Sequence, residues 1–218
     1  MSYVHLLAAC LLLSLSTVAQ TTVCIIRKDT LYTGCTDSAH IQTVKGFNFF
    51  YGGPFDPEVT ATIKEAAANA VDFTTCANSC AQAVKELYLE QFSHIRSTDP
   101  TVFDQKIMGN RLSITVAQIC LFGIENMRPV LIVVVFYMNK GVKHPVVITY
   151  NITHEPMATC SLGPHQRHKG IVGNMDSGGP VAELKKNIGY ETDGPVDGSG
   201  PPIDILVLTK QVRRWIRK

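Results

Sequence analysis

Residues 21–35 read TTVCIIRKDTLYTGC, two runs rich in β-forming residues joined by a short polar pair. Val, Ile, Thr and Tyr predominate in both runs, and these residue types favour extended strands. Lys28 and Asp29 separate the runs, which predicts a hairpin with strands over 22–27 and 31–35. The stretch lies directly behind an apolar leader, so its first residue, Thr21, stands where processing would create a new N-terminus.

The apolar leader has the form of a secretory signal. Leu6 to Leu15 supplies the apolar segment, and Thr17 with Ala19 supplies small residues at the −3 and −1 positions of a cut. The segment is too short to span a bilayer comfortably and has no charged flank. We therefore expect residues 1–20 to be a signal peptide, cleaved after Ala19 or Gln20, and the protein to be secreted, either periplasmic or extracellular.

Composition restricts the classes of partner. Residues 21–218 are enough for one domain with a sizeable core. The formal net charge is only +2, and apart from an Arg-rich C-terminal end the positive residues do not cluster, so no nucleic-acid partner is expected. The apolar run Val130 to Tyr137 is strand-sized, so no membrane span is expected once the signal is removed.

Every cysteine except Cys10 follows the leader, and the resulting even number permits disulfides in an exported chain. Cys76 and Cys80 are one helical turn apart, which suits a shared helix face without showing that they are bonded. No CxxC pair exists, so zinc is not expected. The histidines His154, His165 and His168 lack matching carboxylates. The sequence therefore predicts no metal and no cofactor.

Helices are expected in the middle of the chain. A strand over 44–51 ends at Gly52-Gly53-Pro54, where the chain must turn. Asp56 is a candidate cap and Pro57 suits the first position of a helix over 58–71. A second helix over about 75–95 places one stripe of side chains on a common face: Cys76, Cys80, Val84, Leu87 and Phe92.

The remainder is predominantly β-structure. Strands are expected over 111–122 and 129–137 around a turn at Glu125-Asn126, and over 145–150 and 203–209. A short helix is expected near 181–187, a Gly-, Pro- and Asp-rich loop over 191–202, and a polar tail around Trp215. This order predicts an α+β domain of sheets covered by helices. We expect 22–35 and 44–51 to share one sheet, with both helices packed on it.

An ordered set of short motifs resembles the proteasome β-subunit type of N-terminal nucleophile (Ntn) hydrolase, particularly the small proteasome-like proteins. The run 122–131, FGIENMRPVL, is similar to the hairpin of such proteins, and GSGPPIDI over 198–205 followed by Trp215-Ile216 is similar to their closing strand. The other matches, in chain order, are Thr21-Thr22, Thr36-Asp37-Ser38, Val44-Lys45 and Tyr51-Gly52-Gly53.

The resemblance implies a four-layer αββα sandwich and hydrolysis of peptide or acyl-amide bonds, with no cofactor. By position, Thr21 would be the nucleophile, its α-amine the base, and Asp37 with Lys45 a charge pair that orients it. The backbone N–H of Gly52 would serve the oxyanion hole, and Ser199 would support the amine. Assembly into a homo-oligomer is left open.

The chain departs from the family pattern at three positions. Ala39 stands where an arginine is usual, and Val196 stands where a supporting aspartate is expected. The position of a second supporting serine falls near Pro164. These departures bear on catalysis more than on the fold, so a non-catalytic secreted binding or scaffold protein on the same fold is the alternative.

A trypsin-like serine protease is a more distant alternative. Residues 176–180, DSGGP, match the nucleophile signature of that family around Ser177. His40 could supply the histidine and Asp99 or Asp104 the acid, in the right chain order. The helical residues between histidine and acid do not suit a double β-barrel. Separately, Asn151-Ile152-Thr153 is a glycosylation acceptor if the host is eukaryotic.

Overall fold

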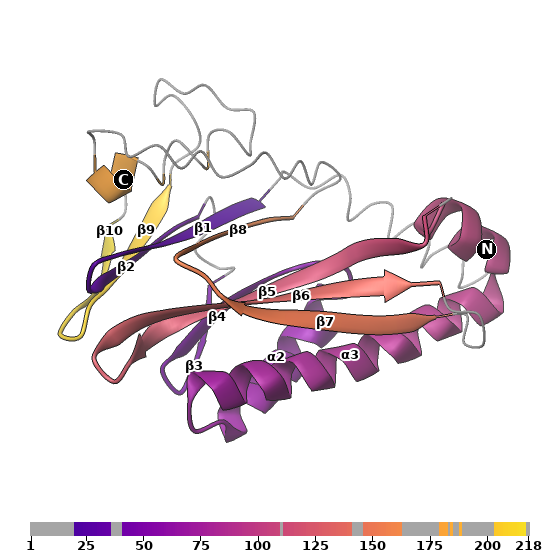
Figure 1. The fold of residues 1–218 in the computed structure, drawn as a ribbon, viewed down its shortest axis with the longest axis horizontal. Helices are drawn as coiled ribbons and strands as arrows, with labels where there is room; N and C mark the ends of the chain where they lie inside the picture. Colours follow the sequence, from indigo (N-terminus) through magenta and orange to yellow (C-terminus); the bar gives the residue numbers. More distant parts are fainter. Residues whose placement is uncertain are drawn as a thin grey trace.

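The computed structural model describes residues 20–35, 41–109, 111–140, 146–162, 179–182, 184, 188 and 203–216. The side chains of residues 20, 21 and 159–162 lie outside that description. Two five-stranded antiparallel sheets and the helices α2 and α3 make up an α+β fold (Figure 1). No helix in the described ranges is both long and apolar enough to cross a bilayer.

The first sheet, called sheet A, has the strand order β10-β9-β2-β1-β8, and the second, sheet B, has the order β3-β4-β5-β6-β7. Sheet A therefore combines the two ends of the described chain, whereas sheet B is continuous in sequence. The elements are β1 (Gln20–Arg27), β2 (Thr30–Cys35), β3 (Gln42–Val44), β4 (Phe47–Gly52), α2 (Asp56–Asn69), α3 (Phe73–Thr98), the π-helix η2 (Val102–Ile107), β5 (Ser113–Glu125), β6 (Arg128–Asn139), β7 (Val147–His154), β8 (Met157–Leu162), β9 (Asp204–Leu208) and β10 (Arg213–Ile216).

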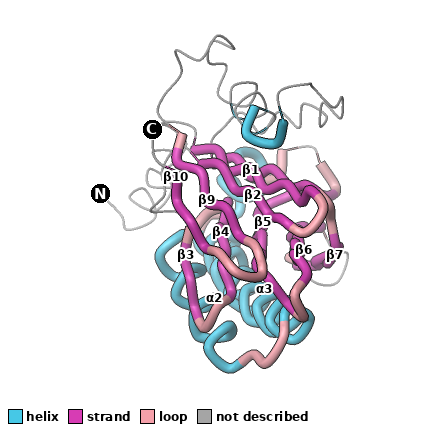
Figure 2. Tube along the Cα trace, turned by 90° about the vertical axis from the view of Figure 1, so that its left-hand side faces the viewer, coloured by secondary structure: helices cyan, strands magenta, loops and turns pink. Residues whose placement is uncertain are grey.

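Three apolar clusters hold these layers together. The largest lies between sheet B and the helices, where Phe49 and Ile132 meet Val84 and Phe92. A second fills the space between the sheets and includes Cys24 of sheet A and Phe50, Cys120 and Phe122 of sheet B. In the third, Leu184 and Ile188 pack against Val23 and Ile25 on the other face of sheet A. Figure 2 shows the helices under sheet B and sheet A above it.

The two helices form as the sequence predicts, with one change at a cap. The expected stripe on α3 is buried except for Leu87, which is partly buried, and the fully buried Tyr88 adds to it. Asp72 caps α3 by accepting the Thr75 N–H at 2.6 Å. On α2 the expected cap was wrong, because Phe55 is the N-cap residue, in the left-handed region, and Asp56 lies in the first turn.

The expectation that 22–35 and 44–51 share a sheet was wrong. β1 and β2 pair in sheet A, whereas β4 pairs with β3 and β5 in sheet B. The predicted single strand is broken at Lys45 and Gly46, which have φ of 47° and 89° and form a hairpin turn. All six residues of β4 are buried, so the strand needs cover on both faces, which sheet A and the helices supply.

Several other boundaries differ from expectation. The strand expected over 145–150 continues to His154 as β7, and β8 follows it after two residues. The polar tail is β10, because its backbone pairs with β9 at the edge of sheet A. The β5–β6 turn is centred on Asn126 and Met127, which both have positive φ. A primed hairpin turn requires that backbone, and it moves the turn by one residue.

Candidate functional site

Thr21 lies near the start of β1, an interior strand of sheet A. Its backbone is in register with Ser161 of β8, and the next residue, Thr22, is in register with Cys35 of β2 and Cys160 of β8. Residues 1–19 lie outside the described residues. From Thr22 to Ile25 the strand is thus paired on both sides, so the backbone next to Thr21 is held in a fixed position.

At one end of sheet A, Thr22 of β1 and Cys35 of β2 are neighbours on the inner face, which points toward sheet B. Thr22 is two residues before Cys24, which belongs to the cluster between the sheets, so both lie on the inner face. Thr22 is only 5% exposed. Beside it, the Cys35 thiol donates to the Asp204 carbonyl at 3.6 Å. Threonine hydroxyl and cysteine thiol are therefore adjacent at the end of sheet A from which Thr21 extends.

Sheet B presents Gly52 at the corresponding end. Gly52 is the last residue of β4, is buried, and is in register with Gln118 of β5. Gln118 in turn donates to the Cys120 thiol at 3.4 Å. The β1–β2 and β5–β6 turns lie together at the left-hand end in Figure 1. Because β1 runs toward that end and β4 runs away from it, Thr21 and Gly52 both lie toward the other end.

Lys45 lies at the wrong end of β4 for a site that contains Gly52. It is exposed in the β3–β4 turn, and a strand of six residues, spanning about 20 Å, separates it from Gly52. The Arg213 side chain donates to the Thr43 hydroxyl at 2.9 Å, which links this hairpin to the β9–β10 end of sheet A. The structure therefore does not bring Lys45 together with Thr21.

The other expected catalytic residues, Asp37 and Ser199, lie outside the described residues, as do His40 and Ser177. Their roles stay predictions. Both candidate acids of the trypsin-like alternative have structural partners. Asp99 accepts the Val102 N–H at 2.9 Å where α3 ends, and Asp104 forms ion pairs, with Arg96 Nε at 3.9 Å and Lys140 Nζ at 3.8 Å. In addition, α2 and α3 occupy a region that a double β-barrel would need for strands.

Five cysteine side chains are described, and all five are buried: Cys24, Cys35, Cys76, Cys80 and Cys120. The sulfurs of Cys76 and Cys80 are 3.9 Å apart on α3. Their hydrogen bond lowers the pKa of the Cys76 thiol, and it raises the pKa of the Cys80 thiol together with burial. Within the described ranges, no group of three or more His, Cys, Asp or Glu residues could hold a metal ion.

No role in the site was predicted from the sequence for Thr22, Cys35 or Gln118. Strand alternation could have placed Thr22 with Cys24, since the two are separated by one residue. It could not have placed Gln118, because a register shift between Thr115 and Ala117 changes the alternation along β5. No protein-family model matches the chain, and a search of curated proteins finds no match either.

Proposed function

We propose that the protein is a secreted amide-bond hydrolase of the Ntn type, with a four-layer αββα arrangement and Thr21 as its nucleophile once residues 1–20 are removed. The observation that carries the proposal is the place of Thr21 in β1. Because the following residue is paired on both sides, a new α-amine at Thr21 would stand on a fixed strand at one end of the sandwich. A base held beside its own hydroxyl suits nucleophilic attack.

The chemistry follows from the two groups of one residue. The α-amine, with a pKa of about 8, takes the proton from the Thr21 hydroxyl as the oxygen attacks the substrate carbonyl. The backbone N–H of Gly52 stabilises the resulting oxyanion, and the absence of a side chain lets substrate approach that backbone. The protonated α-amine then donates its proton to the substrate nitrogen, the carbon–nitrogen bond of the substrate breaks and the substrate amine leaves. An ester to the Thr21 oxygen remains, and water hydrolyses it to the acid. The substrate is a peptide or an acyl amide.

A non-catalytic secreted binding or scaffold protein is the second candidate, and the position of Lys45 favours it. Amine activation in the resembling family uses a lysine near the nucleophile, but here Lys45 lies about 20 Å along β4 from Gly52. If the protein is a hydrolase, another group must therefore act on the amine. Asp37 and Ser199 are the remaining candidates that the resemblance supplies.

The two candidates are distinguished by preparing the chain with Thr21 as its verified first residue. A peptide epoxyketone forms a ring adduct only with a free amine and a neighbouring hydroxyl, so the hydrolase should gain inhibitor mass at Thr21. The matched control begins at Gln20 and should gain none, because its Thr21 nitrogen is an amide. If the Thr21 preparation forms no adduct and hydrolyses no member of a broad peptide and acyl-amide library, the second candidate replaces the first.

A further inference from the structure

Part of the inner face of sheet B extends beyond the apolar cluster between the sheets. Val133 of β6 is buried in that cluster, but later residues on the same face of β6 are only partly buried. On the flanking strands Thr115, Thr149 and Asn151 are exposed. The name "open face" is used for these positions of sheet B: Ser113, Thr115, Tyr137, Asn139, Thr149 and Asn151.

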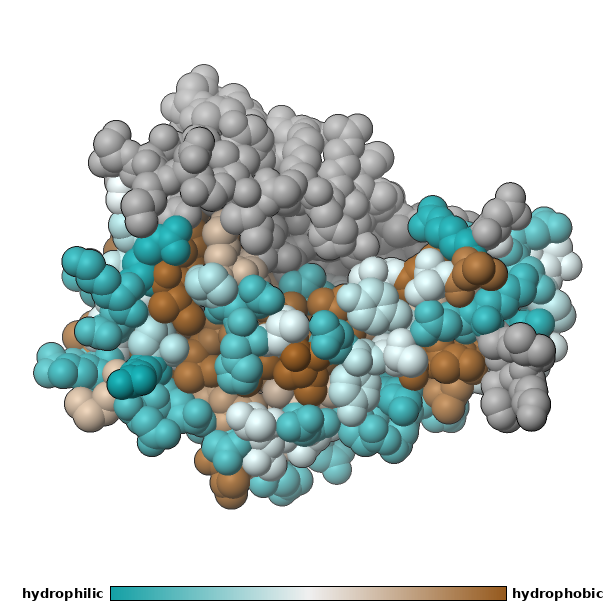
Figure 3. Space-filling model, in the orientation of Figure 1, coloured by the Kyte–Doolittle hydropathy of each residue, from teal (hydrophilic) through white to brown (hydrophobic). Residues whose placement is uncertain are grey.

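The six positions of the open face are polar and uncharged, with Val135 and Val147 lying among them on the same side of the sheet. The Asn139 amide donates to the Thr149 hydroxyl at 3.0 Å, which places both side chains on this face. The register joins Thr115 to Tyr137 and Tyr137 to Thr149, so hydroxyl groups form a row across three strands. On the side of the molecule drawn in Figure 3, teal polar areas and brown apolar areas are mixed over the described residues. An uncharged hydroxyl- and amide-bearing surface suits contact with a neutral polar group.

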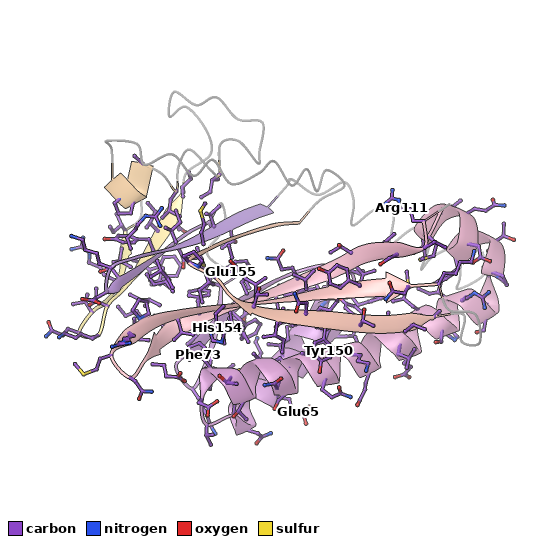
Figure 4. All side chains as sticks on the ribbon, in the orientation of Figure 1. Glu65, Phe73, Arg111, Tyr150, His154 and Glu155 are labelled. Carbon is purple, nitrogen blue, oxygen red and sulfur yellow. The ribbon has the colours of Figure 1, made fainter. Side chains whose placement is uncertain are left out.

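Asn151 is the one residue of this face that begins a glycosylation triplet. Asn151-Ile152-Thr153 is the only Asn-x-Ser/Thr triplet in the 218 residues. Tyr150 and Ile152 pack against the helix-side cluster, and Figure 4 shows Tyr150 between β7 and α3. Strand alternation therefore turns Asn151 away from the helices. β7 is also an edge strand of sheet B, so no further strand of that sheet crowds the residue.

We propose that Asn151 carries an N-linked glycan that projects from the open face. The inference rests on the export step of the proposed function and on a eukaryotic host, because the transfer occurs in a eukaryotic secretory lumen, but it does not rest on catalysis. The donor is a lipid-linked diphosphate oligosaccharide. The Asn151 amide nitrogen bonds to the anomeric carbon, the bond from that carbon to the diphosphate breaks, the lipid diphosphate leaves, and the amide proton passes to solvent through the transferase.

The test is expression of the full chain in a eukaryotic secretory host, followed by mass spectrometry of the peptide that contains Asn151. The expected result is a hexose-rich glycan mass on that peptide. Treatment with a peptide-N-glycosidase should remove it and leave aspartate at position 151. Because Asn151 is exposed, the enzyme should act on the native protein as well as on the denatured protein. Release only after denaturation would overturn the placement on an open face.

Matched variants of β7 distinguish loss of the acceptor triplet from a general change in the strand. Thr153→Ala and Asn151→Gln should abolish the glycan, whereas Thr153→Ser should keep it because serine completes the triplet. Thr149→Ala removes a hydroxyl from the same face and strand without touching the triplet, so it should keep the glycan. A second form of the chain, in which a foreign signal peptide replaces the leader, tests export separately from modification. If only that form carries a glycan, the chain's own leader has failed to export it and the acceptor site is intact. If neither form carries a glycan, the proposal is overturned.

Discussion

The Glu125 carboxylate accepts the backbone N–H of Phe73 at 2.8 Å. Glu125 is the last residue of β5, and Phe73 is the first residue of α3, so the tip of a hairpin in sheet B satisfies a donor that the helix itself leaves unpaired. The negative charge also lies at the positive end of the helix dipole. The Phe73 ring packs edge-on against the Phe47 ring, with the two ring centroids 4.9 Å apart. The start of α3 is thus fixed to sheet B by a charge-assisted bond and a ring contact.

Glu125→Ala should lower the free energy of unfolding by about 1–3 kcal/mol, because it removes a charged acceptor and leaves a partly buried N–H unpaired. Glu125→Gln keeps an acceptor oxygen without the charge and should lose less. Urea unfolding followed by circular dichroism measures both. An alanine variant as stable as the parent chain would show that water satisfies the Phe73 N–H equally well.

Gly123→Ala should be destabilising because of the same aromatic ring. A β-carbon at Gly123 would lie 2.6 Å from Phe73 Cζ, and overpacking of this kind costs about 1–3 kcal/mol. Phe73→Leu should relieve much of that cost, so the two substitutions should couple in a double-mutant cycle. Gly46→Ala is the matched control. Its φ is +89° and nothing lies within 4 Å of the added carbon, so its cost is backbone strain that Phe73→Leu cannot relieve.

Hydrolysis by the chain that begins at Thr21 should be abolished by Thr21→Ala and partly retained by Thr21→Ser. Lys45→Ala should change the rate by less than about threefold, because Lys45 is separated from Gly52 by the length of β4, about 20 Å, which is well beyond the screening length of physiological salt. A lysine that activates the amine directly would instead cost about 10²-fold or more when removed. Rate measurements with a fluorogenic peptide amide distinguish these outcomes, and a loss of the larger size would place Lys45 in the site.

Asp72 should make the stability of α3 depend on acid pH. The hydrogen bond from the Thr75 backbone N–H, the largest contribution, lowers the pKa of the Asp72 carboxylate below its ordinary value. A lowered folded-state pKa adds stability above the unfolded pKa, near 4, and that stability is lost as the pH falls through the folded-state pKa. The Asp72→Asn variant still caps but does not titrate, so its stability difference from the parent chain should shrink as acid is added. A difference that stays constant from neutral to acid pH would contradict this.

The local patterns in the sequence predicted much of the secondary structure. The hairpin of β1 and β2 follows from two β-rich runs with a polar pair between them. Helix α3 follows from apolar residues that recur about once per helical turn and so form one buried stripe. The division into two sheets was not predictable in this way. It depends on long-range pairing, such as that of Cys35 with Asp204, which places β2 beside β9. The break between β3 and β4 within sheet B was equally hidden, because it needs a positive φ at Lys45, which a non-glycine residue rarely adopts.

The candidate site was predicted less completely, for a related reason. The place of Thr21 at the start of a strand follows from local sequence, and so does that of Gly52 at the end of one. Which end of β4 lies near Thr21 depends on the direction in which one sheet crosses the other. A list of motifs in chain order contains no such direction, so Lys45 was grouped with Gly52 although the whole strand separates them.

The composition of sheet A from both ends of the chain constrains the order in which the protein can be completed during synthesis. β2 receives its neighbour β9 only after the ribosome has passed residue 208, whereas all strands of sheet B have been made by residue 154. At a synthesis rate of about 5–20 residues per second, β2 lacks its partner β9 for on the order of ten seconds or more. During that interval the β2 edge offers unpaired backbone groups to any other extended chain, so a ribosome stalled before β9 would release a species prone to pair with its own copies.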